Sequence, residues 1–265
     1  MTFNKRSLLF ASSLFFICLL INVALVFAVP RGADVNPITS STAVGREPQW
    51  NDALAGNVTE LTIFGYSTTQ SWQGYYGNVS GVIELSNNAG KVMYNWSLAS
   101  PSGEIYASTN QTLQWVNVQC FNYTATGTYD NEVGNGGKMN LYGTNLSQIE
   151  SLFGISSIDV DGVDETFNLI GASGHRAFIS AANEFSQGEC WSTRIFDSTG
   201  QQSSGNFENV LLYEPVSGSI VFASLLNKDL EGFDGATHDF EMLVLERGRD
   251  GNLDTTRYYF FVELE

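Results

Sequence analysis

The first hydrophobic stretch of the chain runs without interruption from Ser7 to Ala28 and has one strongly polar member. As a helix these 22 residues would span a hydrocarbon core of about 30 Å. Lys5 and Arg6 precede the stretch, which is typical of a segment that keeps its N-terminus in the cytoplasm and exports the rest. The pattern predicts an N-terminal hydrophobic helix in residues 1–28, either a retained signal anchor or a signal peptide cleaved after Ala28.

Beyond this segment the pattern changes twice. Residues 29–49 are polar, contain three prolines and show no period, so they predict a linker. From residue 50 onward, short apolar or alternating runs are separated by Gly, Asn, Asp and Ser, which is typical of β-strands joined by turns. The predicted strands are Glu60–Ser67, Val79–Leu85, Lys91–Leu98, Glu104–Ala107, Thr112–Tyr123, Phe167–Ile170, Ala177–Ala181, Trp191–Phe196, Val210–Glu214, Ser219–Leu225, Asp239–Glu246 and Arg257–Leu264.

Turn and cap signals connect these strands. Asn87–Gly90 and Ser100–Gly103 contain the residues that hairpin turns favour, and the last two predicted strands flank a Gly- and Asp-rich turn, which predicts a C-terminal hairpin. The one convincing helix starts with a capping box at Ser147–Glu150 and stops at Gly154.

Many short strands without a parallel βαβ alternation predict an all-β fold: a two-sheet antiparallel sandwich, jelly-roll or Ig-like, preceded by the N-terminal helix. The expected organisation is a leader at 1–28, a linker at 29–49 and an ectodomain at 50–265. Whether the ectodomain divides into two sub-domains near residues 143–154 stays open at this stage.

The net charge and the cysteines indicate which partners and which cellular compartment to expect. The chain has 28 acidic and 12 basic residues and a formal net charge of −16, so it repels phosphate backbones, and nucleic acid is not an expected partner. The same charge attracts divalent cations. Cys18 lies in the hydrophobic stretch, which leaves Cys120 and Cys190 for one disulfide in an oxidising compartment.

Two groups of residues are candidates for modification and metal binding. Asn-x-Ser/Thr sequons, which are glycosylation acceptors, occur at Asn57, Asn78, Asn95, Asn110, Asn122 and Asn145. The stretch from residue 159 to 165 alternates carboxylates around a glycine, and such a loop can supply several of the six to eight oxygens that Ca²⁺ requires. The predicted calcium ligands are Asp159, Asp161, Asp164 and Glu165, although the loop does not match the EF-hand pattern, and turn chemistry explains it equally well. No other cofactor is expected.

Aromatic residues are the remaining candidates for ligand contact. Trp72, Tyr75 and Tyr76 lie among glycines, and exposed rings in such a segment could stack on sugar faces. Enzyme chemistry has weaker support. The chain has two histidines and no G-x-S-x-G elbow, so no catalytic residue is predicted. A glycosidase needs only two carboxylates, and residues 157–161 resemble, without its outer glutamates, the E-x-D-x-E strand of β-sandwich glucanases.

The segments SWQGYYGNVSGVIEL, KVMYNWSLASPSGEIYAS, GFDGATHDFEMLVLE and RYYFFVELE resemble a group of archaeal surface proteins with no assigned activity. The resemblance covers most of residues 60–265 and implies an N-terminal membrane segment followed by a β-rich ectodomain.

These observations together predict an exported cell-surface protein with a structural, adhesive or binding role in the envelope. Its expected partners are the membrane, through the N-terminal segment, and glycans, other envelope proteins or further copies of itself. A lectin-like carbohydrate-binding module, a β-sandwich glycosidase and a pilus-like filament subunit are the alternatives.

Overall fold

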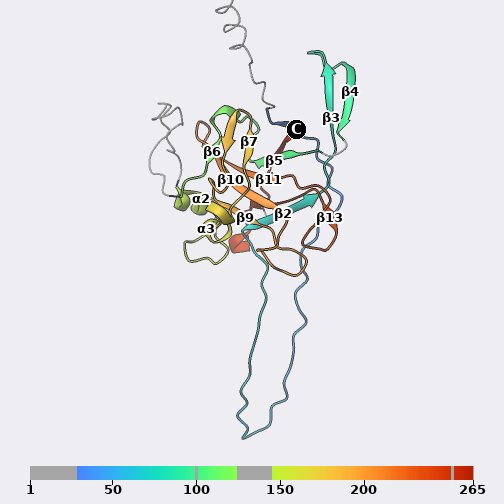
Figure 1. The fold of residues 1–265 in the computed structure, drawn as a ribbon. Helices are drawn as coiled ribbons and strands as arrows, with labels where there is room; N and C mark the ends of the chain where they lie inside the picture. The colour runs from blue at the N-terminus through green and yellow to red at the C-terminus, as the bar shows by residue number, and fades with distance from the viewer. Residues whose placement is uncertain (1–28, 99–100, 124–144, 252–253, 265) are drawn as a thin grey trace, which may run out of the picture.

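The computed structural model describes residues 29–98, 101–123, 145–251 and 254–264 (Figure 1). These residues form mostly β-strands in antiparallel sheets with few helices, which confirms the all-β prediction. The predicted N-terminal helix lies outside the described residues. Within the described ranges, no helix is both long enough and apolar enough to cross a membrane.

The largest sheet has seven strands in the order β1-β15-β5-β11-β10-β6, with β9 paired to the other end of β10. Their bounds are β1 Arg31–Gly32, β5 Gly103–Ser108, β6 Gln119–Cys120, β9 Ser192–Arg194, β10 Glu208–Glu214, β11 Ser219–Leu225 and β15 Tyr259–Leu264.

The remaining elements are four two-stranded sheets and several short helices. The pairs are β2 Trp72–Gly77 with β14 Phe240–Leu245, β3 Gly81–Ser86 with β4 Val92–Leu98, β7 Phe178–Ser180 with β8 Asn183–Phe185, and β12 Leu230–Glu231 with β13 Thr237–His238. The helices are α2 Leu146–Leu152, α3 Val163–Thr166 and the 3₁₀ turns η1 Trp115–Asn117, η2 Gly171–Ser173 and η3 Arg249–Gly251.

Apolar clusters cover both faces of the large sheet. On one face Leu211 and Phe222 pack with Met242 and Val244 of β14 and with residues of α2 and α3. On the other face Val210 and Val221 pack with Trp115, the β7–β8 pair and Cys190. Successive side chains of a strand point to opposite faces, and both faces of this sheet are covered, so β10 and β11 are buried along their whole length.

Strand pairing departs from the sequence prediction at the C-terminus. The predicted hairpin between the last two strands is wrong, because β14 pairs with β2 while β15 pairs with β5 and β1. A turn between two strands does not determine which strands they pair with. Here the two consecutive strands belong to different sheets, β14 to the pair with β2 and β15 to the large sheet. Likewise β5 pairs with β11 and β15 and not with β4, so the hairpin predicted around residues 100–103 is also absent.

Other predicted elements also differ. The segment Thr112–Tyr123 is not one strand: it contains η1, whose Trp115 is buried, and then the two-residue β6. Residues 167–170 contribute a single bridge, from Leu169 to Ser192. The helix caps on Asn145, two residues before the predicted capping box, and its predicted stop at Gly154 holds, with φ of +72°.

Two segments lie apart from the body of the fold (Figure 1). Residues 34–69, here called the arm, are exposed throughout and form no strand or helix, so the predicted strand Glu60–Ser67 has no pairing partner in the described chain. The arm extends past residue 49, where the linker was predicted to end. The β3–β4 hairpin, which the Asn87–Gly90 turn correctly predicted, projects at the other end of the molecule.

Candidate functional site

The predicted calcium loop is divided into two halves that contact different partners. Asp159 and Asp161 both form ion pairs with Arg249, at 3.0 Å between Nη1 of Arg249 and Oδ2 of Asp159 and at a shorter distance for Asp161. Asp161 also accepts a hydrogen bond from the Thr69 hydroxyl at 2.6 Å, and its backbone oxygen accepts one from the Trp72 indole at 2.8 Å. This half of the loop therefore fixes the base of the arm to the body.

The electrostatics of Asp161 agree with this structural role. Although burial acts to raise it, the Thr69 hydroxyl and then the Arg249 guanidinium hold the pKa of Asp161 below its ordinary value. A carboxylate already held by a guanidinium is a poor calcium ligand, since the cation would have to displace it.

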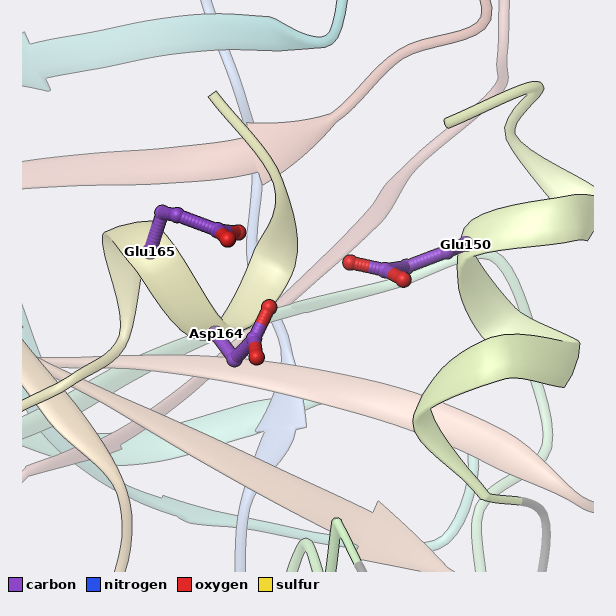
Figure 2. A group of neighbouring side chains, drawn as sticks. All are labelled: Glu150, Asp164 and Glu165. Atoms are coloured by element: carbon purple, nitrogen blue, oxygen red, sulfur yellow. The ribbon is translucent and has the colours of Figure 1, made fainter. Parts of the chain in front are cut away.

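The other half of the loop forms an acidic cluster with a residue that the sequence did not indicate. Carboxylate oxygens of Glu150, Asp164 and Glu165 all lie within 4.8 Å of one another, with Glu150 contributed by the end of α2 and the other two by α3 (Figure 2). Glu150 accepts a hydrogen bond from the Val163 amide at 3.2 Å. A Cβ atom at Gly162 would lie 3.0 Å from the Glu150 carboxylate and closer still to that of Glu165, so a side chain there would displace these carboxylates.

Crowding of like charges changes the proton affinity of the cluster. Burial, followed by the nearby carboxylates, raises the pKa of Glu150, and burial together with Asp164 raises the pKa of Glu165. Three carboxylates supply fewer oxygens than Ca²⁺ prefers, so water or backbone oxygens would complete the set. The calcium prediction stays a prediction, with Glu150 now in the place of Asp159 and Asp161.

Replacing Glu150 by glutamine is expected to have opposite effects with and without calcium. A raised pKa means that the folded state binds the proton more tightly than the unfolded state, so stability falls as the pH rises through that pKa. Without metal, Glu150→Gln keeps an acceptor for the Val163 amide and removes one repelling charge, and should leave the melting temperature at pH 7 unchanged or higher.

If the wild-type cluster binds Ca²⁺ with a Kd of about 1 mM, 10 mM CaCl₂ should stabilise it by about 1.4 kcal/mol, or roughly 3–6 °C. Glu150→Gln should lose most of that increase, while the control Glu184→Gln, at an exposed position on β8, should keep it. Thermal melts at pH 7 with and without CaCl₂ measure both effects. Equal calcium shifts in wild type and Glu150→Gln would refute a metal site in this cluster.

The three aromatic candidates occupy different environments on β2, an element that was not predicted as a strand. The ring centroid of Trp72 lies 5.7 Å from that of Phe167, and that of Tyr75 lies 5.2 Å from that of Phe260, so both half-buried rings pack against the core. Tyr76 is 46% exposed and lies 5.1 Å from the ring of Phe233. Among the three, Tyr76 alone keeps the exposure that a stacking contact with a sugar needs.

Comparison with known proteins adds no relative. The chain matches no protein-family model, no curated protein and no solved structure.

Both histidines have structural partners. His175 is fully buried; its Nε2 accepts a hydrogen bond from the Cys190 amide at 3.0 Å, and its Nδ1 lies 2.7 Å from the backbone oxygen of Arg176. Burial lowers the pKa of His175, which keeps the ring neutral near the disulfide. His238 contacts Asp234 at 2.9 Å within the β12–β13 turn.

One pair of glutamates deserves comparison with the geometry of a glycosidase. Glu104 and Glu263 stand directly opposite each other on β5 and β15. Both are buried, and the Ala181 amide donates to both carboxylate oxygens of Glu263 at 3.1 and 3.0 Å. A sugar and a water molecule have no access to carboxylates buried to this extent, so this pair does not support hydrolysis.

The sequons differ in accessibility. Asn57, Asn78 and Asn95 are exposed, whereas Asn110, Asn122 and Asn145 are half-buried. The Asn110 amide donates to Ser219, and Asn145 caps α2. Glycan attachment is therefore sterically easiest at the first three sites.

Cys120 and Cys190 form the predicted disulfide, across 70 residues of sequence.

Proposed function

We propose that the chain is an exported envelope protein with a structural role, which it performs by binding other protein subunits and not by catalysis. The observation that carries this proposal is the arm. Ten large apolar side chains are exposed on it: Val35, Ile38, Val44, Trp50, Leu54, Val58, Leu61, Ile63, Phe64 and Tyr66. Apolar surface on this scale is unfavourable in water and is typical of a segment that is buried in a partner.

The arm also lacks backbone partners. Within the described residues 34–69, the one backbone–backbone hydrogen bond runs from the Asn57 amide to the Leu54 oxygen, at the turn that joins the two legs of the arm. The legs otherwise touch where the Arg46 guanidinium lies 3.7 Å above the Tyr66 ring. Unpaired extended backbone is the form in which a segment adds to a sheet of another chain.

Further observations support the remaining parts of the proposal. The disulfide is consistent with an oxidising compartment, and the hydrophobic leader favours export. The layer formed by β14 and β2 packs on the large sheet, which favours a β-sandwich, jelly-roll or Ig-like, as the ectodomain architecture. A lectin-like role is the second candidate, and the exposed Tyr76–Phe233 pair favours it.

Limited proteolysis tests the role of the arm. Trypsin should cut the purified full-length protein in detergent first after Arg46, because the arm is exposed and unpaired, and should cut near Lys228 in the body much later. In envelopes prepared from cells that make the protein, the Arg46 site should be protected at least about tenfold in rate, because a partner covers the arm. Equal cleavage rates in both samples would contradict the proposal.

Export is tested separately, by labelling intact cells with an amine reagent that does not cross membranes. Lys91 and Lys228 should be labelled on intact cells, whereas Lys5 of a retained leader should react only after the cells are lysed. Labelling of Lys91 and Lys228 only after lysis would place the protein inside the cell and end the proposal.

A further inference from the structure

The β3–β4 hairpin has one apolar face that is largely uncovered in the described structure, except at its base, where the Leu264 side chain packs against Gly81. Cross-strand partners in an antiparallel pair point to the same face, and the register pairs Ile83 with Trp96 and Leu85 with Tyr94. These four side chains are 50–60% exposed, and the rings of Tyr94 and Trp96 lie 4.9 Å apart. Four half-exposed side chains of this size present a patch on the order of 400 Å², a size that is often functional on a monomer.

The opposite face of the hairpin is more polar and carries the Glu84–Asn95 pair. Asn95 is one of the exposed sequons, so a glycan there would leave the apolar face free. The outer edges of β3 and β4 are unpaired in the described residues, and a two-stranded hairpin with an uncovered apolar face is marginally stable by itself. The hairpin therefore lacks both a third strand and a cover.

The arm contains a segment whose apolar alternation suits a β-strand but which belongs to no sheet. Phe64 and Tyr66 lie on one side of the second leg, with ring centroids 4.8 Å apart, and Leu61 and Ile63 alternate with them. This is the segment Glu60–Ser67, which the sequence predicts as a strand and which pairs with no strand among the described residues of its own chain. The arm segment thus has the pattern of a strand without a neighbouring strand, and the β3–β4 hairpin is a sheet with free edges.

The arm segment and the β3–β4 hairpin of the same molecule lie too far apart to pair (Figure 1). In Figure 1 the arm loops away from one end of the body, whereas the β3–β4 hairpin projects from the other end. A second copy placed head to tail presents its hairpin to the arm of the first. Such an interface is heterologous. After two copies bind, one still has a free arm and the other a free hairpin, and each can bind a further copy.

Charge favours this pairing over other contacts between copies. The chain has a net charge of −16, but residues 81–98 contain one acid, Glu84, and one base, Lys91, and residues 57–71 contain Glu60 as their one charged residue. An antiparallel alignment of Phe64 with Ile83 places Tyr66 beside Gly81, next to the Leu264 side chain that packs there, and brings Glu60 to the turn that Lys91 closes. Copies therefore meet where their mutual repulsion is weakest.

We propose that residues 60–66 of one copy add as a third strand to the β3–β4 hairpin of the next copy, and that repetition of this contact builds a chain of subunits. This inference rests on the proposed structural function and identifies the partner as the protein itself.

A complementation experiment with full-length protein in detergent tests the inference. The arm variant is Phe64→Asp with Tyr66→Asp, and the hairpin variant is Tyr94→Asp with Trp96→Asp. By analytical ultracentrifugation, wild type should form species larger than a dimer. Each variant alone should be monomeric, with association weakened by about 100-fold or more because aromatic anchors dominate such interfaces.

An equimolar mixture of the two variants should form a dimer and stop there, because one intact arm and one intact hairpin remain. This result holds even if the hairpin variant unfolds locally, since that variant still supplies its arm. The control Val116→Asp, at a residue 67% exposed on η1, should assemble like wild type.

The outcomes separate the two proposals. A mixture that stays monomeric, or a variant that assembles like wild type by itself, overturns the arm–hairpin contact while leaving association of the protein intact. A wild type that is monomeric at every concentration overturns self-assembly, and the arm would then have to bind a different envelope protein.

Discussion

Removal of the Cys120–Cys190 disulfide is expected to lower the free energy of unfolding by about 4 kcal/mol, because the bond closes a loop of 70 residues in the unfolded chain. For a domain of this size the melting temperature should fall by roughly 10 °C. The suitable variant is Cys120→Ser with Cys190→Ala, since Cys190 is fully buried and a serine there would bury a hydroxyl.

The structure also predicts where this variant loosens first. The disulfide joins β6 to the residues just before β9, and β6 and β9 are short strands that pair with β10. Two or three residues of pairing hold a strand weakly, so amide hydrogen exchange should accelerate at residues 119–121 and 190–194 before the centre of β10 responds. Cys18→Ser is the matched control and should change neither quantity. Identical melting of wild type with and without reductant, once reduction is verified by gel mobility, would contradict the prediction.

Replacement of Phe222 by alanine is expected to cost about 3–5 kcal/mol, the range for a large aromatic residue lost from a packed core. Phe222 is 1% exposed at the centre of β11 and contacts the rings of Trp72, Phe167 and Tyr258. Phe222 therefore packs against β2, against the residue that follows α3 and against the residue that precedes β15. No neighbouring ring can fill the gap without breaking its own contacts.

Chemical denaturation of Phe222→Ala should still show one transition, shifted to lower denaturant concentration. The large sheet combines β5 and β6, which precede residues 143–154, with β9, β10, β11 and β15, which follow them, so both parts should unfold together. The control Phe233→Ala removes a ring that is 47% exposed and should cost less than about 1 kcal/mol. Two separate transitions, one of them unchanged by Phe222→Ala, would instead indicate two sub-domains.

The candidate site illustrates how sequence spacing can mislead. Four acids between residues 159 and 165 suggest one cation-binding loop. In the structure Asp159 and Asp161 form ion pairs with Arg249, whereas Asp164 and Glu165 cluster with Glu150. Arg249 is 88 residues from Asp161, and no local pattern relates them. The one signal that could have pointed to Glu150 is its place after buried Ile149 at the end of a short apolar helix, which is weak by itself.

The sequence alone determined the features that depend on local chemistry. Runs such as that of β11 predict buried strands because both faces are apolar, and the Asn87–Gly90 turn predicts the β3–β4 hairpin because its residues accept the required backbone angles. The two cysteines outside the leader, Cys120 and Cys190, predict the disulfide because only one pairing between them is possible. Tertiary structure decided which strands are neighbours, which acids share a partner and which strand remains unpaired. These features depend on contacts between residues far apart in the sequence. An apolar pattern indicates that a strand is buried, but it does not indicate which residues cover it.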